Sequence, residues 1–265
     1  KMEPEVPSWL NESYFATVLQ DGVDQEPRMT VTSFTAKSAL PLDQNYGTYV
    51  FRVKVQYTLG ESVDKHVISL IIKTPVSHGF LSEYMEKIDL FNREQRFYAD
   101  VLSQLNKRAK FEFGPKDFYC PDRNRLVLKD LNEDGYVMAD RSKQLDLSHC
   151  KLENTLEHQF AVKLVDFQYP RYSSPAVDLI YFIWTSADEG VRETKQEELL
   201  DIYLQTLNST LEELGCQERL TAEELRQDLR ALADWVLVLI CQLLPTVLCE
   251  PKDVIKTEDF KQEDF

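Results

Sequence analysis

The chain has 265 residues, of which 43% are hydrophobic and 11% aromatic, so it contains enough apolar side chains for a folded protein with a sizeable core. Its formal net charge of −15 argues against non-specific nucleic-acid binding and against an anionic membrane surface as a partner, because both need basic residues. Five scattered cysteines without a Cys-x-x-Cys pair predict reduced thiols in a cytoplasmic protein.

The first half of the sequence predicts paired strands. Over residues 49–57 apolar and polar residues alternate, as expected for a half-buried strand. A polar stretch at 58–66, with a glycine near its start, predicts a hairpin connection. The second strand, residues 67–73, is almost continuously apolar until its terminal lysine, and Pro75 and Gly79 then end it.

A long helix is predicted next, over residues 81–105. Its apolar residues recur at spacings of three and four, and Glu94 lies on the same stripe. A short strand over residues 125–131 then leads into an acidic loop, residues 132–135. The first half is therefore expected to be β-rich, with one long helix.

The second half is poor in strands. One more strand is predicted over residues 160–167, with Asp166 near its end. Beyond Pro175, helices are predicted over residues 177–186, 193–214 and 221–248. A β-rich half followed by a helical half predicts an α+β fold of two packed lobes, and small ligands commonly bind in the cleft between lobes.

One uncharged run, residues 235–249, invites a membrane interpretation. It holds 15 residues, including Gln242 and Pro245, which is fewer than the roughly 20 needed to span a bilayer. A buried core helix is the prediction, and no membrane partner is expected. Residues 1–20 are polar and acidic, unlike a secretory signal, and the aperiodic tail at 251–265 is predicted to be mobile.

Two charged residues of the first half sit where charge is costly. Glu94 lies on the core-facing stripe of the long helix, and a buried carboxylate needs a partner. Lys73 ends an apolar strand just upstream. Kinases use a strand lysine and a helix glutamate to hold the α- and β-phosphates of ATP. The alternative is a solvated strand-end lysine and a partly exposed helix acid.

Asp166 is a third candidate. It follows an apolar run and precedes Phe167 and Gln168, so the motif is close to the Asp-Phe-Gly of kinases. An aspartate at the end of a strand can face a cleft and bind Mg²⁺. The alternative is an aspartate that caps the next turn.

The sequence lacks the remaining parts of a kinase site. Phosphate transfer to an alcohol needs an aspartate that acts as acid–base catalyst and an asparagine for a second Mg²⁺. None of the four histidines begins a His-x-Asp motif, and the one His-Gly, at His78, lies in the wrong half. The interval between Asp130 and Asp166 has room for a hairpin loop and one helix only. We therefore predict no catalytic residue.

Seven segments combine into a pattern that is more specific than any of its parts. They are Pro7–Glu12, Asn45–Thr48, Ser69–Lys73, Phe91–Tyr98, Leu126–Leu131, Val165–Gln168 and Arg171–Pro175. In this order they resemble the insect ecdysteroid-kinase-like family, distant relatives of choline and aminoglycoside kinases. The resemblance implies a two-lobed protein-kinase-like fold of that type. A β-rich nucleotide-binding lobe would span residues 1–128 and a truncated helical lobe residues 129–250, followed by the tail at 251–265.

The resemblance further implies ATP-dependent phosphorylation of a hydroxyl group, on an ecdysteroid or a similar lipophilic alcohol. The implied cofactor-binding residues are Asn45, Gly47, Lys73, Glu94, Leu128 and Asp130, with Asp166 as the Mg²⁺ ligand. The first two belong to a loop that covers the phosphates, the next two form the lysine–glutamate pair, and the last two mark the backbone that meets adenine. We expect a monomer.

The chain departs from the family at one place. Family members carry a His-Gly-Asp catalytic loop ahead of Asp-Phe-Gln, whereas here Cys150–Asn154 runs almost directly into Phe160, with a seam expected at 156–160. Loss of a general base alone costs about 10²–10⁴ in rate, so we expect little or no phosphate transfer. The alternatives are a non-catalytic pseudokinase and the product of an incomplete gene model. An abrupt seam favours the latter and predicts reduced stability.

Overall fold

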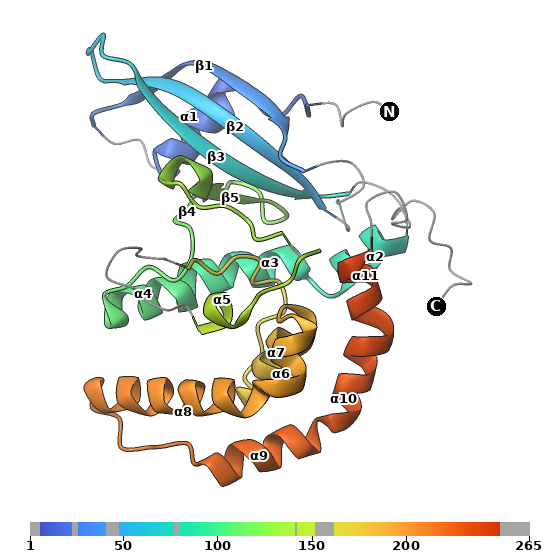
Figure 1. Cartoon of the computed structure of the whole chain (residues 1–265). Helices are drawn as coiled ribbons and strands as arrows, with labels where there is room; N and C mark the ends of the chain where they lie inside the picture. Colours follow the sequence, from blue (N-terminus) through green and yellow to red (C-terminus); the bar gives the residue numbers. More distant parts are fainter. Residues whose placement is uncertain are drawn as a thin grey trace. The chain divides into compact units, whose positions relative to one another are not determined.

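The computed structural model describes residues 6–22, 26–40, 48–76, 80–140, 142–151 and 162–249 (Figure 1). The chain combines helices with an antiparallel sheet, which confirms the α+β class. It divides into two compact units. Among the described residues, the first unit comprises those up to 137 together with 162–170, and the second comprises 138–151 and 171–249. The named strands all belong to the first unit.

The sheet has five antiparallel strands in the order β1-β2-β3-β5-β4. Their bounds are Met29–Ser38 for β1, Thr48–Leu59 for β2, His66–Pro75 for β3, Asp117–Phe118 for β4 and Leu126–Lys129 for β5. Strands β2, β3 and β5 agree with the sequence-based prediction. Strands β1 and β4 were not predicted, because β1 is mostly polar and β4 has only two residues.

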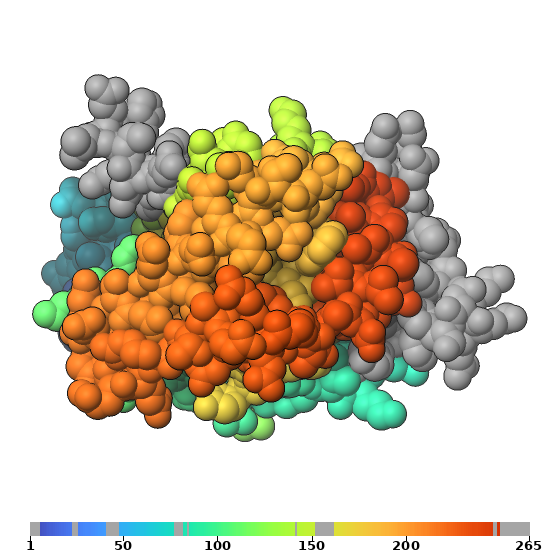
Figure 2. Space-filling model, turned by 60° about the horizontal axis from the view of Figure 1, so that its bottom comes forward, coloured from blue at the N-terminus to red at the C-terminus, as the bar shows by residue number. Residues whose placement is uncertain are grey.

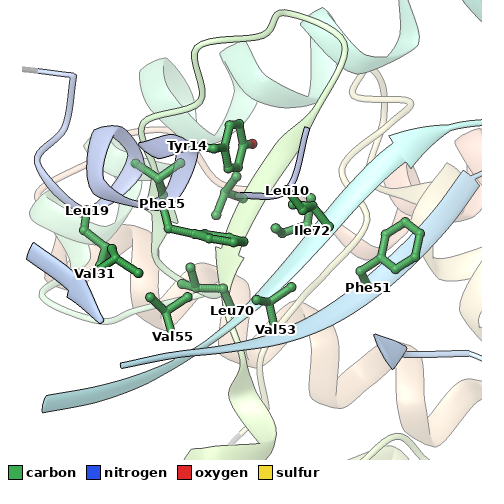
Figure 3. Packing of buried hydrophobic residues seen from close by; sticks show 12 residues of the cluster. Leu10, Tyr14, Phe15, Leu19, Val31, Phe51, Val53, Val55, Leu70 and Ile72 are labelled. Carbon is green, nitrogen blue, oxygen red and sulfur yellow. The ribbon is translucent and has the colours of Figure 1, made fainter. Parts of the chain in front are cut away.

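The core of the first unit lies between the sheet and helix α1, Glu12–Leu19 (Figure 3). Alternate residues of β2 and neighbours on β3 face the helix, because successive strand residues point to opposite sides. The buried contacts join Phe15 and Val18 of α1 to Val53, Leu70 and Ile72. Each fully buried side chain of this kind contributes about 1.5–3 kcal/mol. This packing fixes β3, and with it Lys73.

The predicted single helix over residues 81–105 is wrong as one continuous element. The structure has α2 at Phe80–Lys87, α3 at Leu90–Arg96, a π-helix η2 at Phe97–Leu102 and α4 at Ser103–Ala109. The break falls at Asp89, whose φ of 55° lies in the left-handed region. Its carboxylate accepts a hydrogen bond from Asn92 Nδ2 at 2.7 Å, which stabilises the start of α3 locally.

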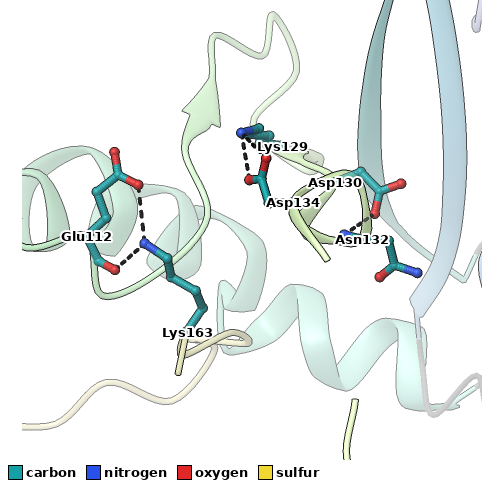
Figure 4. A network of polar contacts seen from close by, with 6 residues as sticks. All are labelled: Glu112, Lys129, Asp130, Asn132, Asp134 and Lys163. Carbon is teal, nitrogen blue, oxygen red and sulfur yellow. Dashed lines mark hydrogen bonds and ion pairs between the residues drawn. The ribbon is translucent and has the colours of Figure 1, made fainter. Parts of the chain in front are cut away.

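The predicted strand over residues 160–167 is also wrong for the part that the structure describes. Residues 162–167 form no strand, although the Leu164 amide donates to the Phe113 carbonyl at 2.6 Å. Lys163 turns away to Glu112, with 3.2 Å between Nζ and Oε2 (Figure 4). Within the described chain, no strand pairs with this segment, and Val162, Leu164 and Val165 are exposed. The alternation of residues was correct, but a strand also needs a partner.

The second unit is helical, and its helices come to the front in orange and red in Figure 2. They are α5 (Leu147–Lys151), α6 (Ala176–Thr185), α7 (Glu189–Thr194), α8 (Gln196–Glu213), α9 (Ala222–Ala231), α10 (Ala233–Val238), the π-helix η4 (Leu239–Leu243) and α11 (Leu244–Leu248). Their core contains Ala176, Ile183, Leu200 and Leu225. A capping box is present at Thr221, where α9 begins.

The uncharged run at 235–249 is helical but not a buried core helix, so that prediction is wrong. Of α10, η4 and α11, the described side chains include one buried residue, Leu239, whereas Trp235, Leu237 and Val238 are exposed. Among the described residues, no helix has both the length and the apolar character required to cross a bilayer. The second unit therefore leaves part of the apolar surface of this run exposed.

Candidate nucleotide and metal site

Lys73 lies on the central strand of the sheet. It pairs with Val50 of β2 on one side and with Leu126 of β5 on the other. Hydrogen-bonded neighbours on both sides fix its backbone, and the side chain is almost entirely buried. A buried ammonium group needs anionic partners. Lys73 is therefore not a solvated strand-end lysine.

Glu94, on α3, supplies the first partner. Both of its carboxylate oxygens accept hydrogen bonds from Lys73 Nζ, at 3.0 Å and 2.9 Å, and the Glu94 side chain is fully buried. Burial raises the pKa of Glu94, and the neighbouring Lys73 opposes that rise. The structure thus brings together the two residues that the sequence singled out.

Asp166 contacts the same ammonium group. Its Oδ1 lies 2.5 Å from Lys73 Nζ, while 62% of its side chain is exposed. Its φ of 71° is left-handed, a conformation that aspartate tolerates better than most residues. The next ring, Phe167, stacks on Phe97 with 4.5 Å between centroids and meets Tyr98 edge-on at 5.3 Å. These contacts anchor the main chain beside the exposed carboxylate.

The π-helix η2 places Tyr98 beneath this segment. Its ring packs with Leu102, Leu126 and Leu128, and its hydroxyl group is buried without a hydrogen-bond partner in the described chain. Burial raises the pKa of Tyr98, and the carboxylates of Glu94 and Asp166 add to the rise. π-helical turns are frequent at functional sites.

Asp130 lies elsewhere, beyond the end of β5. Its buried carboxylate accepts hydrogen bonds from Arg52 Nε at 2.7 Å, Ser69 Oγ at 2.8 Å and the Asn132 amide at 3.2 Å. Figure 4 shows the last of these. Ser69 and Lys73 are four residues apart on β3, which corresponds to about 13 Å along a strand. No sequence pattern predicted the role of Arg52, and the one signal for Ser69 was a polar residue inside an apolar strand.

The backbone expected to meet adenine is already hydrogen-bonded in part. Leu128 is buried in β5, between β3 and β4. The Lys129 amide donates to the Lys116 carbonyl at 2.8 Å, and the Asp130 amide donates to the Ser69 carbonyl at 3.0 Å. A bound base would have to use other groups. The predicted loop residues Asn45 and Gly47 lie outside the described residues, as do the seam at 156–160 and the tail at 251–265.

A magnesium ion fits this site only together with phosphate groups. In the described part of the chain, no cluster of three or more acidic, histidine or cysteine side chains is placed to hold a metal. Asp166 alone offers an exposed carboxylate beside Lys73. Mg²⁺ is commonly bound by one or two carboxylates, with substrate phosphates and water completing the shell. A single aspartate therefore suits a metal that arrives with a nucleotide.

A strand lysine, a helix glutamate and an aspartate that meet at one ammonium group are arranged as in the phosphate site of kinases. The model of the ecdysteroid kinase-like family matches residues 43–156 and 153–216, which together exceed half of the 265 residues. The chain belongs to the ecdysteroid kinase-like family. Comparisons with curated proteins and with solved structures found no match. The two matched stretches meet at residues 153–156, directly beside the expected seam.

Proposed function

We propose that the chain binds ATP with Mg²⁺ and transfers phosphate to a hydroxyl group poorly or not at all. The acceptor of the family reaction would be an ecdysteroid or a similar lipophilic alcohol. The observation that supports nucleotide binding most directly is the buried Lys73–Glu94 pair with Asp166 on the same ammonium group. Burying the two charges of the Lys73–Glu94 pair is costly, and the binding of phosphate would account for it.

Each residue has a part in this proposal. Lys73 binds the α- and β-phosphates, and Glu94 holds the lysine side chain in place. Asp166 binds Mg²⁺, which neutralises phosphate charge when bound. The loop with Asn45 and Gly47 covers the phosphates, and the end of β5 near Leu128 and Asp130 receives adenine through groups other than the two occupied amides.

The proposal of weak or absent transfer rests on the missing catalytic loop. Without a general base the rate falls by about 10²–10⁴, and the lost positioning of the alcohol contributes further. The second candidate is therefore a pseudokinase that binds nucleotide without chemistry. The third is an incomplete gene model. It is favoured by the division of the family match at residues 153–156 and by the exposed apolar side chains of 162–165.

The proposal includes a two-lobed arrangement of the aminoglycoside and choline kinase type. Residues 1–128 would form the nucleotide-binding lobe and residues 129–250 the truncated helical lobe. The two compact units support two lobes, although the segment 162–170 groups with the first unit. We also propose a cytoplasmic monomer, and five scattered cysteines without a Cys-x-x-Cys pair support a reducing compartment.

A thermal-shift titration with Mg-ATP tests nucleotide binding. Saturating ligand at 100 times its Kd should stabilise the fold by about 2.7 kcal/mol. Lys73→Ala should abolish the shift. The matched control is Lys54→Ala on the neighbouring strand β2, because Lys54 is half-exposed and pairs with Glu133. This control variant should retain the thermal shift. No shift in folded wild-type protein would contradict the proposal.

Sequencing the transcript across the seam separates the remaining alternatives. Catalytic-loop codons present in the gene but absent from this sequence would establish an incomplete model, and the full-length product should then transfer phosphate. A genomic sequence that is continuous through residues 156–160 would rule out the missing exon. The chain would then be a pseudokinase or an impaired enzyme, to be distinguished by an ATP-consumption assay with an ecdysteroid.

A further inference from the structure

We infer that the contact between Asp166 and Lys73 is a latch that blocks phosphate binding until a divalent cation draws Asp166 away. Nucleotide binding would therefore depend on the metal. This inference rests on the proposed function and adds a form of regulation to the same site. It follows from the number of acceptors around one ammonium group, the unequal burial of the two carboxylates and the anchoring of Phe167.

The donors of Lys73 are fully used. A lysine ammonium group has three N–H donors. Its Nζ contacts three oxygens, Glu94 Oε1 at 3.0 Å, Glu94 Oε2 at 2.9 Å and Asp166 Oδ1 at 2.5 Å. No N–H group of Lys73 is left to donate to a phosphate oxygen. A phosphate group must therefore replace one of these contacts before Lys73 can bind it.

The two carboxylates differ in their ability to leave. Glu94 is fully buried, so separating it from Lys73 would strand a charge in the core at high cost. Asp166 has 62% of its side chain in solvent, where water can replace the lysine. Phe167 is held by Phe97 and Tyr98, so the Asp166 carboxylate can turn while the main chain stays in place. Asp166 is therefore the contact that opens.

A phosphate alone and a phosphate with metal meet this latch differently. Metal-free ATP brings negative charge toward the Asp166 carboxylate, and like charges at short range repel. A divalent cation attracts the same carboxylate and phosphate oxygens together, which frees one donor of Lys73. The latch would thus exclude metal-free nucleotide and admit the metal complex.

Binding of a fluorescent ATP analogue, TNP-ATP, measured with Mg²⁺ or with EDTA, tests the latch. Wild type should bind weakly in EDTA and tightly with Mg²⁺. Asp166→Asn should bind about 10- to 100-fold more tightly than wild type in EDTA, because a charge-assisted hydrogen bond of about 1.5–3 kcal/mol no longer competes. Asparagine and glycine both tolerate the left-handed backbone, so Asp166→Gly is the second variant. Equal wild-type affinity in both buffers, or no gain in the two variants, would overturn the inference.

A control and a nucleotide-free measurement complete the design. Asp100→Asn removes an exposed carboxylate from η2 and should leave the EDTA affinity unchanged. Cyanate carbamylation of Lys73, followed by peptide mass spectrometry, reports on the latch without nucleotide, and its rate should rise several-fold in Asp166→Asn. An unchanged rate overturns the latch even if TNP-ATP binds. Failure to bind TNP-ATP under every condition, with a raised carbamylation rate, contradicts the proposed function and leaves the Lys73–Asp166 contact established.

Discussion

Two buried carboxylates in the first unit have different surroundings. Glu94 depends on a single lysine, and this lysine also contacts Asp166. Asp130 accepts hydrogen bonds from an arginine, a serine and a main-chain amide. A carboxylate with every oxygen satisfied stabilises the fold, whereas a shared and partly exposed arrangement can be rearranged by a ligand. We therefore expect Asp130 to stabilise the fold and the contacts of Lys73 to rearrange when a ligand binds.

Replacing Asp130 should destabilise the first unit. Asp130→Ala leaves Arg52 and Ser69 without their buried acceptor, and breaking such a pair costs about 3–5 kcal/mol. Asp134→Ala, which removes a half-exposed partner of Lys129, should cost less than about 1 kcal/mol. Urea denaturation of the two variants gives the comparison, and equal losses would contradict the assignment.

Removing the hydroxyl group of Tyr98 should stabilise the protein. The group is buried without a described partner, and such a group costs about 1–3 kcal/mol, whereas Tyr98→Phe keeps the ring contacts. Tyr14→Phe is the matched control, because the Tyr14 hydroxyl lies 3.5 Å from Cys120 Sγ and should be neutral or favourable to keep. A lower melting temperature for Tyr98→Phe would contradict the prediction and would mean that this hydroxyl has a hydrogen-bond partner, such as the neighbouring main chain of Asp166.

At the scale of elements, the sequence predicted what depends on local pattern. The alternation of β2 and the apolar run of β3 are local features, and both are present. The break at Asp89 and the missing strand at 162–167 depend on backbone conformation and on a distant partner, which periodicity does not report. At the site, the pattern revealed Lys73, Glu94 and Asp166. The partners of Asp130 come from different strands and were not predictable.

The exposed segment at 162–165 should promote self-association. Val162, Leu164 and Val165 present apolar surface on a segment that belongs to no strand, and neighbouring exposed apolar side chains favour association with another chain. Leu164→Lys should therefore reduce light scattering as protein concentration rises. Val137→Lys changes a still more exposed apolar residue outside the segment, 85% exposed against 53% for Leu164, and should nevertheless have the smaller effect. Equal effects would contradict a role for this segment.

At the scale of the whole molecule, the two units differ in how well they cover their apolar residues. The first unit buries a continuous cluster between α1 and the sheet. The last helices of the second unit leave Trp235, Leu237 and Val238 exposed. We expect the second unit to open first, because local stability follows the number of buried apolar contacts.

Hydrogen exchange measures this difference directly. Amides of residues 233–248 should exchange faster than those of β2 and β3, whose ladder hydrogen bonds surround buried side chains. Mg-ATP should slow exchange near Lys73 and Asp166 more than in α9, which supplies an internal reference. Uniform protection across both regions would contradict the expected order of opening.

The first unit is discontinuous in sequence, since residues 162–170 return to it after the chain has entered the second. This affects the order of synthesis. When the ribosome has released residues 1–137, Lys73 and Glu94 are present, but Asp166 and the ring of Phe167 are not yet made. Until residues 162–170 have been synthesised, the apolar cluster around Tyr98 therefore lacks the ring of Phe167 that packs against it. A shorter expression clone that stops at residue 137 would leave it in that unfinished state.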